Sequence, residues 1–220
     1  MKLRRLVLAA GVLALLVCLG TFATAGPNVL TTIPESPNPD SRYVFYLHGK
    51  IIEDSGRRPE HPRFGIYEYD AVLEALEKRG YLVISEKRKP STKVGAYAQK
   101  TAAQIEELLS KGVPPDRITV VGFSKGGRIV QAVSAELKPP IRYVMLASCP
   151  RLGGGPRLHG RVLAIREESD LSVGSCSALF DRSPGILEHR ELVTKLGGGH
   201  GAFYKPQEAW LVAVGEWIEQ

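Results

Sequence analysis

The sequence predicts an α/β protein, in which a mostly parallel, six-stranded sheet is covered by helices on both faces as a three-layer α/β/α sandwich. Short β-branched and aromatic runs alternate with segments whose apolar residues recur at helical spacing, and this alternation is typical of parallel sheets. The length of 220 residues fits one domain. The composition, 44% apolar and 24% charged, excludes a disordered or fibrous chain.

Six segments carry the strand pattern, beginning with RYVFYL at 42–47. Each is short and apolar or β-branched, as expected of strands that are buried on both faces. The expected strands are 42–47, 81–85, 118–121, 142–147, 162–166 and 191–196.

Between the strands, apolar side chains recur every three or four residues and predict helices that pack one face on the sheet. The first begins at Tyr69 and ends before Gly80, and the third ends before Pro139. The expected helices lie near 69–79, 94–109, 125–137 and 207–218. The polar stretch 49–65 is expected to be a long loop.

The N-terminal residues 1–25 predict a secretory signal peptide. Lys2, Arg4 and Arg5 form a positive start, an apolar run follows at 6–19, and small residues precede the expected cleavage site after Ala25. The apolar run is shorter than the roughly 20 residues of a membrane-spanning helix. We therefore expect a secreted or periplasmic protein, and an uncleaved N-terminal membrane anchor is the alternative.

A Pro-, Asn- and Ser-rich lead-in at 26–41 is expected to precede a single globular domain at 42–220. The formal charge of the chain is +6. Cleavage would remove three positive residues, and the remaining charge is too small and too evenly spread to indicate a nucleic-acid partner. We expect a monomer with no membrane span after cleavage.

The sharpest motif is Gly-Phe-Ser-Lys-Gly at 122–126, directly between the expected strand 118–121 and the expected helix 125–137. A turn this tight strains the backbone of its central residue, Ser124, and the flanking glycines leave room for packed neighbours. The serine would lie at the carboxyl edge of the sheet, against a helix N-terminus that favours developing negative charge. The motif predicts that Ser124 is a catalytic nucleophile.

A serine nucleophile needs a base, and His200 is the histidine that follows the last expected strand. It stands in Gly-Gly-Gly-His-Gly, where glycines allow a loop to fold closely over the sheet edge. His159 and His189 precede expected strands and should lie at the opposite edge, and His61 stands in a polar loop. We therefore predict that His200 is the base.

The base needs a carboxylate that orients its ring, and the fifth expected strand ends in Arg-Glu-Glu-Ser-Asp at 166–170. A loop that follows a parallel strand lies at the same sheet edge as Ser124. We predict that Asp170 is this carboxylate, and Glu168 and Asp181 are the alternatives.

The order Ser124, Asp170, His200 resembles that of the α/β-hydrolase superfamily, as does the strand that ends in Leu-His-Gly at 47–49. The resemblance spans 42–218. It implies the strand order 2-1-3-4-5-6, because the chain has no room for the two leading strands of larger members. The segment between the fourth and fifth expected strands is short, so we expect no helical lid, as in small secreted esterases that resemble cutinase.

The same resemblance implies an oxyanion hole made by two backbone N–H groups. One would belong to Lys125, the residue after the nucleophile. The other would belong to Lys50, with Ile51 as the alternative. His48 is expected to brace this loop rather than to act on the substrate.

Cys149 and Cys176 are the two cysteines that follow the signal peptide, and export places them in an oxidising compartment. They follow the fourth and fifth expected strands, which should be neighbours. A Cα separation of about 4.4–6.8 Å is then within reach. We predict a disulfide that closes a loop containing Asp170.

Together these features predict a secreted serine hydrolase that acts on a small-molecule ester or acyl substrate, in the first place a carboxylic ester. A thioesterase, peptidase or acyltransferase would use the same residues, and a binding protein that kept the fold is the alternative from another class. The sequence shows no metal-ligand cluster and no dinucleotide fingerprint, so no metal or cofactor is expected. Several basic residues are expected near the mouth of the site, where they either attract an anionic substrate or are ordinary surface charge. They are Lys50, Arg57, Arg58, Lys125 and 87–89.

Overall fold

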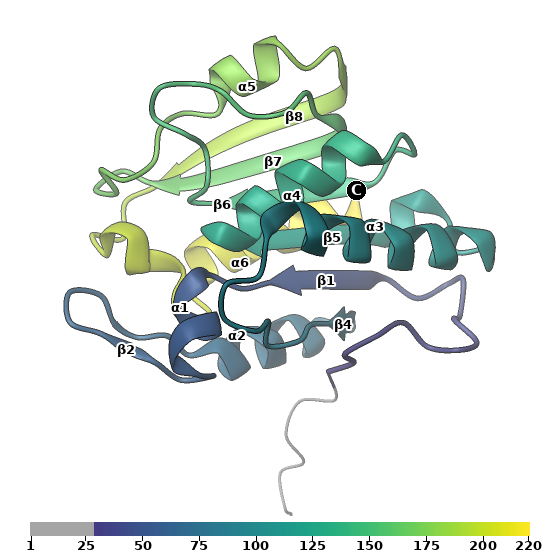
Figure 1. Ribbon diagram of the computed structural model, residues 1–220, viewed down its shortest axis with the longest axis horizontal. Helices are drawn as coiled ribbons and strands as arrows, with labels where there is room; N and C mark the ends of the chain where they lie inside the picture. Colours follow the sequence, from purple (N-terminus) through teal and green to yellow (C-terminus); the bar gives the residue numbers. More distant parts are fainter. Residues whose placement is uncertain (1–28) are drawn as a thin grey trace, which may run out of the picture.

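The structure, a computed structural model, describes residues 29–220 and confirms the predicted α/β fold (Figure 1). Six strands form the central sheet in the order β4–β1–β5–β6–β7–β8, which is the predicted 2-1-3-4-5-6, and every pairing in this sheet is parallel. The expected signal peptide, 1–25, lies outside the described residues. Within 29–220, no helix is both long and apolar enough to span a membrane.

The strands of the central sheet are β1 (Tyr43–Leu47), β4 (Leu82–Ile84), β5 (Ile118–Phe123), β6 (Arg142–Leu146), β7 (His159–Glu167) and β8 (Gly185–Thr194). The last strand begins at Gly185, so the predicted start at 191 is wrong. As the edge strand next to β7, β8 exposes several of its side chains. Its polar residues from Glu188 to Glu191 hide the apolar pattern from which a strand is recognised.

Helices cover both faces of the sheet (Figure 1). α3 (Val94–Ser110), α4 (Lys125–Glu136) and the short α5 (Ser177–Asp181) pack on one face, and α2 (Tyr69–Glu77) and α6 (Glu208–Glu219) pack on the other. Successive residues of β1 alternate between the two apolar cores, Tyr43 and Phe45 on one side and Val44 and Tyr46 on the other. All four are buried. The sheet is therefore fixed from both sides, and the loops after its strands project from one rigid edge.

The stretch 49–65 is more ordered than the predicted loop. It contains the short helix α1 (Lys50–Ser55) and a small antiparallel hairpin formed by β2 (Glu60–His61) and β3 (Gly65–Ile66). α1 spans only about one and a half turns, which is too short for a helical period to be read from the sequence.

Candidate active site

Ser124 occupies the tight turn between β5 and α4. Its φ of 54° and ψ of −116° lie outside the usual regions for a residue with a side chain. A Cβ at Gly126 would lie 1.7 Å from the Leu47 carbonyl oxygen, and a Cβ at Gly122 would lie 2.4 Å from the Gly126 oxygen. Both glycines are therefore required by close packing, and together they hold Ser124 at the carboxyl edge of the sheet.

The structure brings the three predicted residues of the reaction centre into one hydrogen-bonded chain. The Ser124 hydroxyl lies 2.8 Å from His200 Nε2, and His200 Nδ1 lies 2.7 Å from Asp170 Oδ2. With the imidazole proton on Nδ1, that nitrogen donates to the carboxylate, and Nε2 accepts from the hydroxyl. This geometry allows His200 to withdraw a proton from Ser124 while Asp170 stabilises the charge that develops on the ring.

Asp170 is held ionised by several donors. Burial raises the pKa of this carboxyl, but the hydrogen bonds from His200 and Ser172 outweigh it and keep the pKa below its ordinary value. The Ser172 backbone N–H and hydroxyl donate to Oδ1 at 3.0 and 2.6 Å. The alternative carboxylates lie elsewhere: Glu168 pairs with Lys195, and Asp181 is an exposed residue of α5. Sequence reasoning missed Ser172.

The loop that carries His200 is fastened to the end of β7 by Glu167. This buried carboxylate accepts hydrogen bonds from the Thr194 hydroxyl and from the N–H groups of Leu196 and Gly197, at 2.6 to 3.0 Å. Burial raises the pKa of Glu167, and these donors more than offset it, so the pKa lies below its ordinary value. Nothing in the sequence distinguished Glu167 from its neighbours, because its partners lie about 30 residues further on, at the end of β8 and just after it.

Three other histidines make their contacts with residues other than Ser124. His159 begins β7, and its backbone N–H and carbonyl both bond the Ser134 hydroxyl. His189 lies within β8 rather than before it, and its ring stacks on Phe180. His61 stacks on Phe64, whose ring centroid in turn lies 6.3 Å from that of His200. Among the described histidines, His200 is therefore the one whose ring bonds the Ser124 hydroxyl.

The two residues expected to supply the oxyanion hole, Lys50 and Lys125, each stand first in a helix that begins beside Ser124. The first N–H groups of a helix have no acceptor within it and can donate to a bound anion. A Cβ on Gly49 would lie 3.7 Å from the Cβ of Ser124, so the start of α1 borders the nucleophile. Lys50 lines the hollow at Ser124, whereas Ile51 does not.

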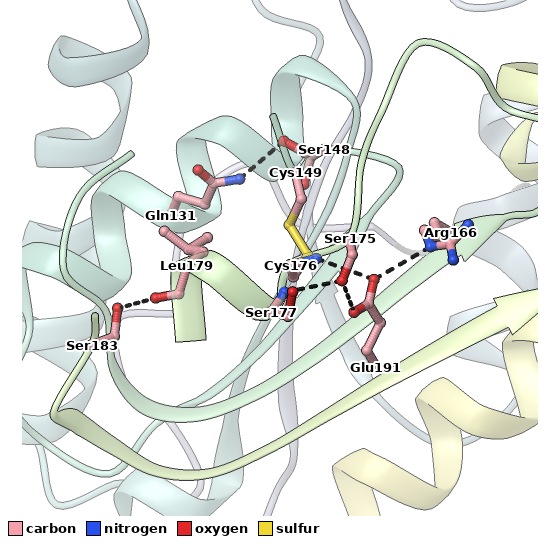
Figure 2. The surroundings of a disulfide bond; sticks show 10 residues. All are labelled: Gln131, Ser148, Cys149, Arg166, Ser175, Cys176, Ser177, Leu179, Ser183 and Glu191. Carbon is pink, nitrogen blue, oxygen red and sulfur yellow. Dashed lines mark hydrogen bonds and ion pairs between the residues drawn. A yellow bond between two sulfur atoms is a disulfide. The ribbon is translucent and has the colours of Figure 1, made fainter. Parts of the chain in front are cut away.

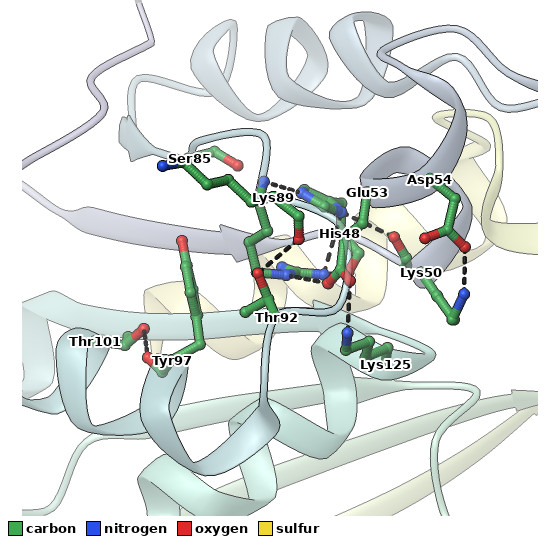
Figure 3. Close-up of polar contacts among 12 residues, drawn as sticks. His48, Lys50, Glu53, Asp54, Ser85, Lys89, Thr92, Tyr97, Thr101 and Lys125 are labelled. Carbon is green, nitrogen blue, oxygen red and sulfur yellow. Dashed lines mark hydrogen bonds and ion pairs between the residues drawn. The ribbon is translucent and has the colours of Figure 1, made fainter.

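A buried charge network joins α1 to α4 behind these N–H groups (Figure 3). Glu53 accepts from Arg88 Nε at 2.7 Å and from Lys125 Nζ at 2.5 Å. The side chains of Glu53 and Arg88 are 0% and 1% exposed. Burial of such charges is tolerated only when they are paired and hydrogen-bonded. The network therefore fixes the two helix starts relative to each other.

His48 belongs to the same network as its neutral member. The Arg88 backbone N–H donates to His48 Nε2 at 3.0 Å, and the Arg88 guanidinium donates to the His48 carbonyl oxygen. Because Nε2 accepts, the ring proton is on Nδ1. Burial first, and then the positive charge of Arg88, lower the pKa of His48 to about 3. His48 braces its loop, as expected.

The predicted disulfide joins Cys149, just after β6, to Cys176 at the start of α5, with a Cα separation of 5.3 Å (Figure 2). Beside it, Glu191 of β8 accepts from the Ser175 hydroxyl at 2.6 Å and from the Cys176 N–H at 3.1 Å. The segment 171–176, which leads away from Asp170, is therefore fastened at its far end to β8 and to the segment that follows β6.

A hollow of about 690 Å³ opens beside Ser124 and His200. Its walls come from the first half of α4 and from the segment 147–158 between β6 and β7, which contains no helix.

Two of the basic residues expected at the mouth, Arg57 and Arg58, line a separate, smaller hollow, and Arg88 is buried. The expectation for these three is wrong, because α1 carries the chain away from the sheet edge and the buried Glu53 draws Arg88 inward. Lys87 and Lys89 do not line the hollow at Ser124 either.

Comparisons with solved structures agree with this architecture. No protein-family model matches the sequence, and no curated protein does. SOBER1 from Arabidopsis thaliana superposes with a TM-score of 0.52 at 12% identity, covering 81% of this chain and 98% of its own. The esterase Pf2001 from Pyrococcus furiosus gives 0.59 at 17% identity, with 82% of each chain covered. An esterase/lipase from an uncultured bacterium gives 0.58 at 13% identity, covering 82% of this chain and 76% of its own. The fold is therefore that of the α/β-hydrolase superfamily.

Proposed function

We propose that this protein is a serine hydrolase that cleaves carboxylic esters of small molecules through an acyl-enzyme. The observation that carries the proposal is the hydrogen-bonded chain from Ser124 through His200 to Asp170, built on a strained turn at the edge of an α/β-hydrolase sheet. The fold alone would not suffice, because this fold also hosts other activities.

In the proposed reaction, Ser124 Oγ attacks the ester carbonyl carbon while His200 Nε2 takes the hydroxyl proton. The N–H groups of Lys50 and Lys125 donate to the oxyanion of the tetrahedral intermediate. His200 then gives the proton to the leaving alkoxide, and the ester C–O bond breaks. Water, deprotonated by His200, attacks the acyl-enzyme, releases the carboxylic acid and restores Ser124.

The test is covalent labelling with a fluorophosphonate, followed by peptide mapping. We expect one labelled residue, Ser124, with no label on the Ser124→Ala variant. Ser148→Ala is the matched control, because Ser148 lines the same hollow but has no histidine partner among the described residues. A label elsewhere, or none on the folded protein, would refute a serine hydrolase. Matched ester, thioester and amide substrates then decide the bond that is cleaved.

We further propose that the chain is exported, that its signal peptide is removed after Ala25, and that 42–220 form a single catalytic domain. The disulfide between Cys149 and Cys176 supports export, because such bonds persist in oxidising compartments. N-terminal sequencing of the exported protein should give Gly26. A chain that still begins at Met1 would instead favour a membrane anchor.

A further inference from the structure

The charged side chains that line the hollow beside Ser124 are basic. Among residues 29–220, its charged lining residues other than His200 are Lys50, Lys125 and Arg128, and no Asp or Glu of this part of the chain lines it. The carboxylates of the site lie behind the wall, because the side chain of Glu53 is 0% exposed and that of Asp170 is 2% exposed. A substrate in the hollow therefore meets basic side chains while the acidic ones are screened from it.

Of these three basic side chains, Arg128 is the one without a partner. Lys125 donates to Glu53, and Lys50 forms an exposed ion pair with Asp54. The Arg128 side chain is exposed and makes no hydrogen bond or ion pair with the residues at 29–220. An arginine offers five donors and binds carboxylates and phosphates with two of them at once.

Arg128 is placed by the helix that starts at the nucleophile. It follows Ser124 by four residues, and its N–H donates to the Ser124 carbonyl at 3.1 Å. Four residues of α-helix advance the chain by about 6 Å, which is one turn. Gln131 and Ala132 line the hollow one turn further on. A substrate that extends from Ser124 along α4 must therefore pass Arg128.

A second arginine stands behind the far wall of the same hollow. A Cβ on Gly155 would lie 3.3 Å from Arg182 Nη2 and 3.4 Å from Gln131 Oε1, and both Gly155 and Gln131 line the hollow. The Nε and Nη2 atoms of Arg182 are buried and have no hydrogen-bond partner in the described residues. Unpaired buried donors are rare, and this guanidinium adds positive potential to the part of the hollow that Gln131 and Gly155 line.

We propose that the natural substrate carries an anionic group, a carboxylate or a phosphate, several bonds from the ester that Ser124 attacks, and that Arg128 binds this group. The inference rests on the proposed esterase function and names its substrate class. Arg128 is then a specificity residue, which does not touch the bond that breaks. The anion could belong to the acyl part or to the alcohol part of the ester, and the chemistry of recognition is the same for both.

The experiment compares matched esters that differ in one charge. For the acyl part, the pair is the mono-p-nitrophenyl ester of adipic acid and p-nitrophenyl hexanoate. For the alcohol part, the pair is the acetate ester of γ-hydroxybutyrate and butyl acetate. We expect kcat/KM to favour the anionic member of one pair, and Arg128→Gln to reduce that preference about 10- to 100-fold. Arg128→Lys should restore part of it, and neutral esters should be cleaved as before.

Arg63→Gln is the matched control, because Arg63 lines a separate, smaller hollow that His200 also borders. Its substitution should leave the preference unchanged. The proposal is overturned if neither anionic ester is preferred, if the preference survives in Arg128→Gln, or if Arg63→Gln abolishes it instead. The ester whose preference depends on Arg128 identifies the part of the substrate that bears the charge.

Binding to the inactive Ser124→Ala variant separates this proposal from the proposed function. Calorimetry compares monoethyl adipate with ethyl hexanoate for the acyl part, and the acetate ester of γ-hydroxybutyrate with butyl acetate for the alcohol part. In one of these pairs the anionic ester should bind more tightly, and the difference should vanish when Arg128→Gln is added. If no ester is cleaved but this difference is found, the esterase function fails and the anion site stands. If neutral esters are cleaved but the difference is absent in both pairs, the esterase function stands and the anion site fails.

Discussion

The two halves of the candidate site are held in place by different means. The half that carries Ser124 and the two helix starts is fixed by close glycine packing and by the buried charges of Glu53 and Arg88. The half that carries His200 and Asp170 lies on loops, which are fixed by many hydrogen bonds to buried carboxylates and by a disulfide. A turn that is held by buried ion pairs is rigid, but it is strongly destabilised when one of the charges is removed. A loop that is held by several separate hydrogen bonds can lose one of them and keep its geometry.

The largest effect is expected on the loop half, at the one carboxylate in direct contact with the base. Asp170→Asn should lower kcat by about 10⁴-fold, because an amide opposite Nδ1 favours the wrong imidazole tautomer. Steady-state kinetics with a p-nitrophenyl ester measures the loss, and circular dichroism checks the fold. Asp181→Asn is the control and should be unchanged. The reverse result would show that Asp181 orients His200.

On the nucleophile half, Glu53→Gln should reduce the free energy of unfolding by about 3–5 kcal/mol, because it leaves Arg88 and Lys125 without their buried counter-charge. Urea unfolding measures the loss. Asp54→Asn removes the neighbouring, exposed carboxylate of the same helix and should change stability by less than about 1 kcal/mol. Equal losses in the two variants would contradict the contrast between the two halves.

Removal of the disulfide tests the loop half by a different route. The double variant Cys149→Ala/Cys176→Ala should lose about 3–4 kcal/mol of unfolding free energy, the chain-entropy figure for a separation of 27 residues. At a temperature where the variant is folded, kcat should be within about threefold of the parent, because the donors to Asp170 and Glu167 persist. A collapse of kcat in the folded variant would mean that the disulfide alone positions Asp170.

The smallest effect is expected when one donor to Asp170 is removed. The pKa of Asp170 is lower in the folded protein than its ordinary value, so the ionised carboxylate stabilises the fold above the ordinary pKa. This stability is lost as the pH falls through the lowered pKa. Ser172→Ala removes the hydroxyl donor and should lower stability at neutral pH by about 1 kcal/mol.

Acid titration of that variant, followed by circular dichroism, should show the unfolding midpoint moved to higher pH. Ser175→Ala is the control, because its hydroxyl bonds Glu191 rather than Asp170. An unchanged midpoint in Ser172→Ala would mean that the Ser172 N–H and His200 are sufficient to hold the carboxylate ionised.

The features that sequence reasoning predicted are those with a local or periodic signature. The parallel strands show as buried apolar runs, Ser124 is marked by its glycines, and Asp170 and His200 follow strands whose shared edge the topology dictates. The charge network could not be predicted, because Glu53 lies 35 residues from Arg88 and 72 from Lys125, and its partners are chosen by packing. Ser172 and the early start of β8 were missed because short polar segments at an exposed edge fit many conformations.

The end of the chain is fastened to the sheet edge that lies opposite the reaction centre. The guanidinium of Arg42, which directly precedes β1, donates to the Ile218 carbonyl in the last turn of α6 at 2.7 Å. Ser124, by contrast, follows β5 at the edge where the parallel strands end. An affinity tag or a surface tether attached after Gln220 would therefore leave the mouth of the hollow facing the solution, and the proposed activity should be the same for the tethered and the untethered protein.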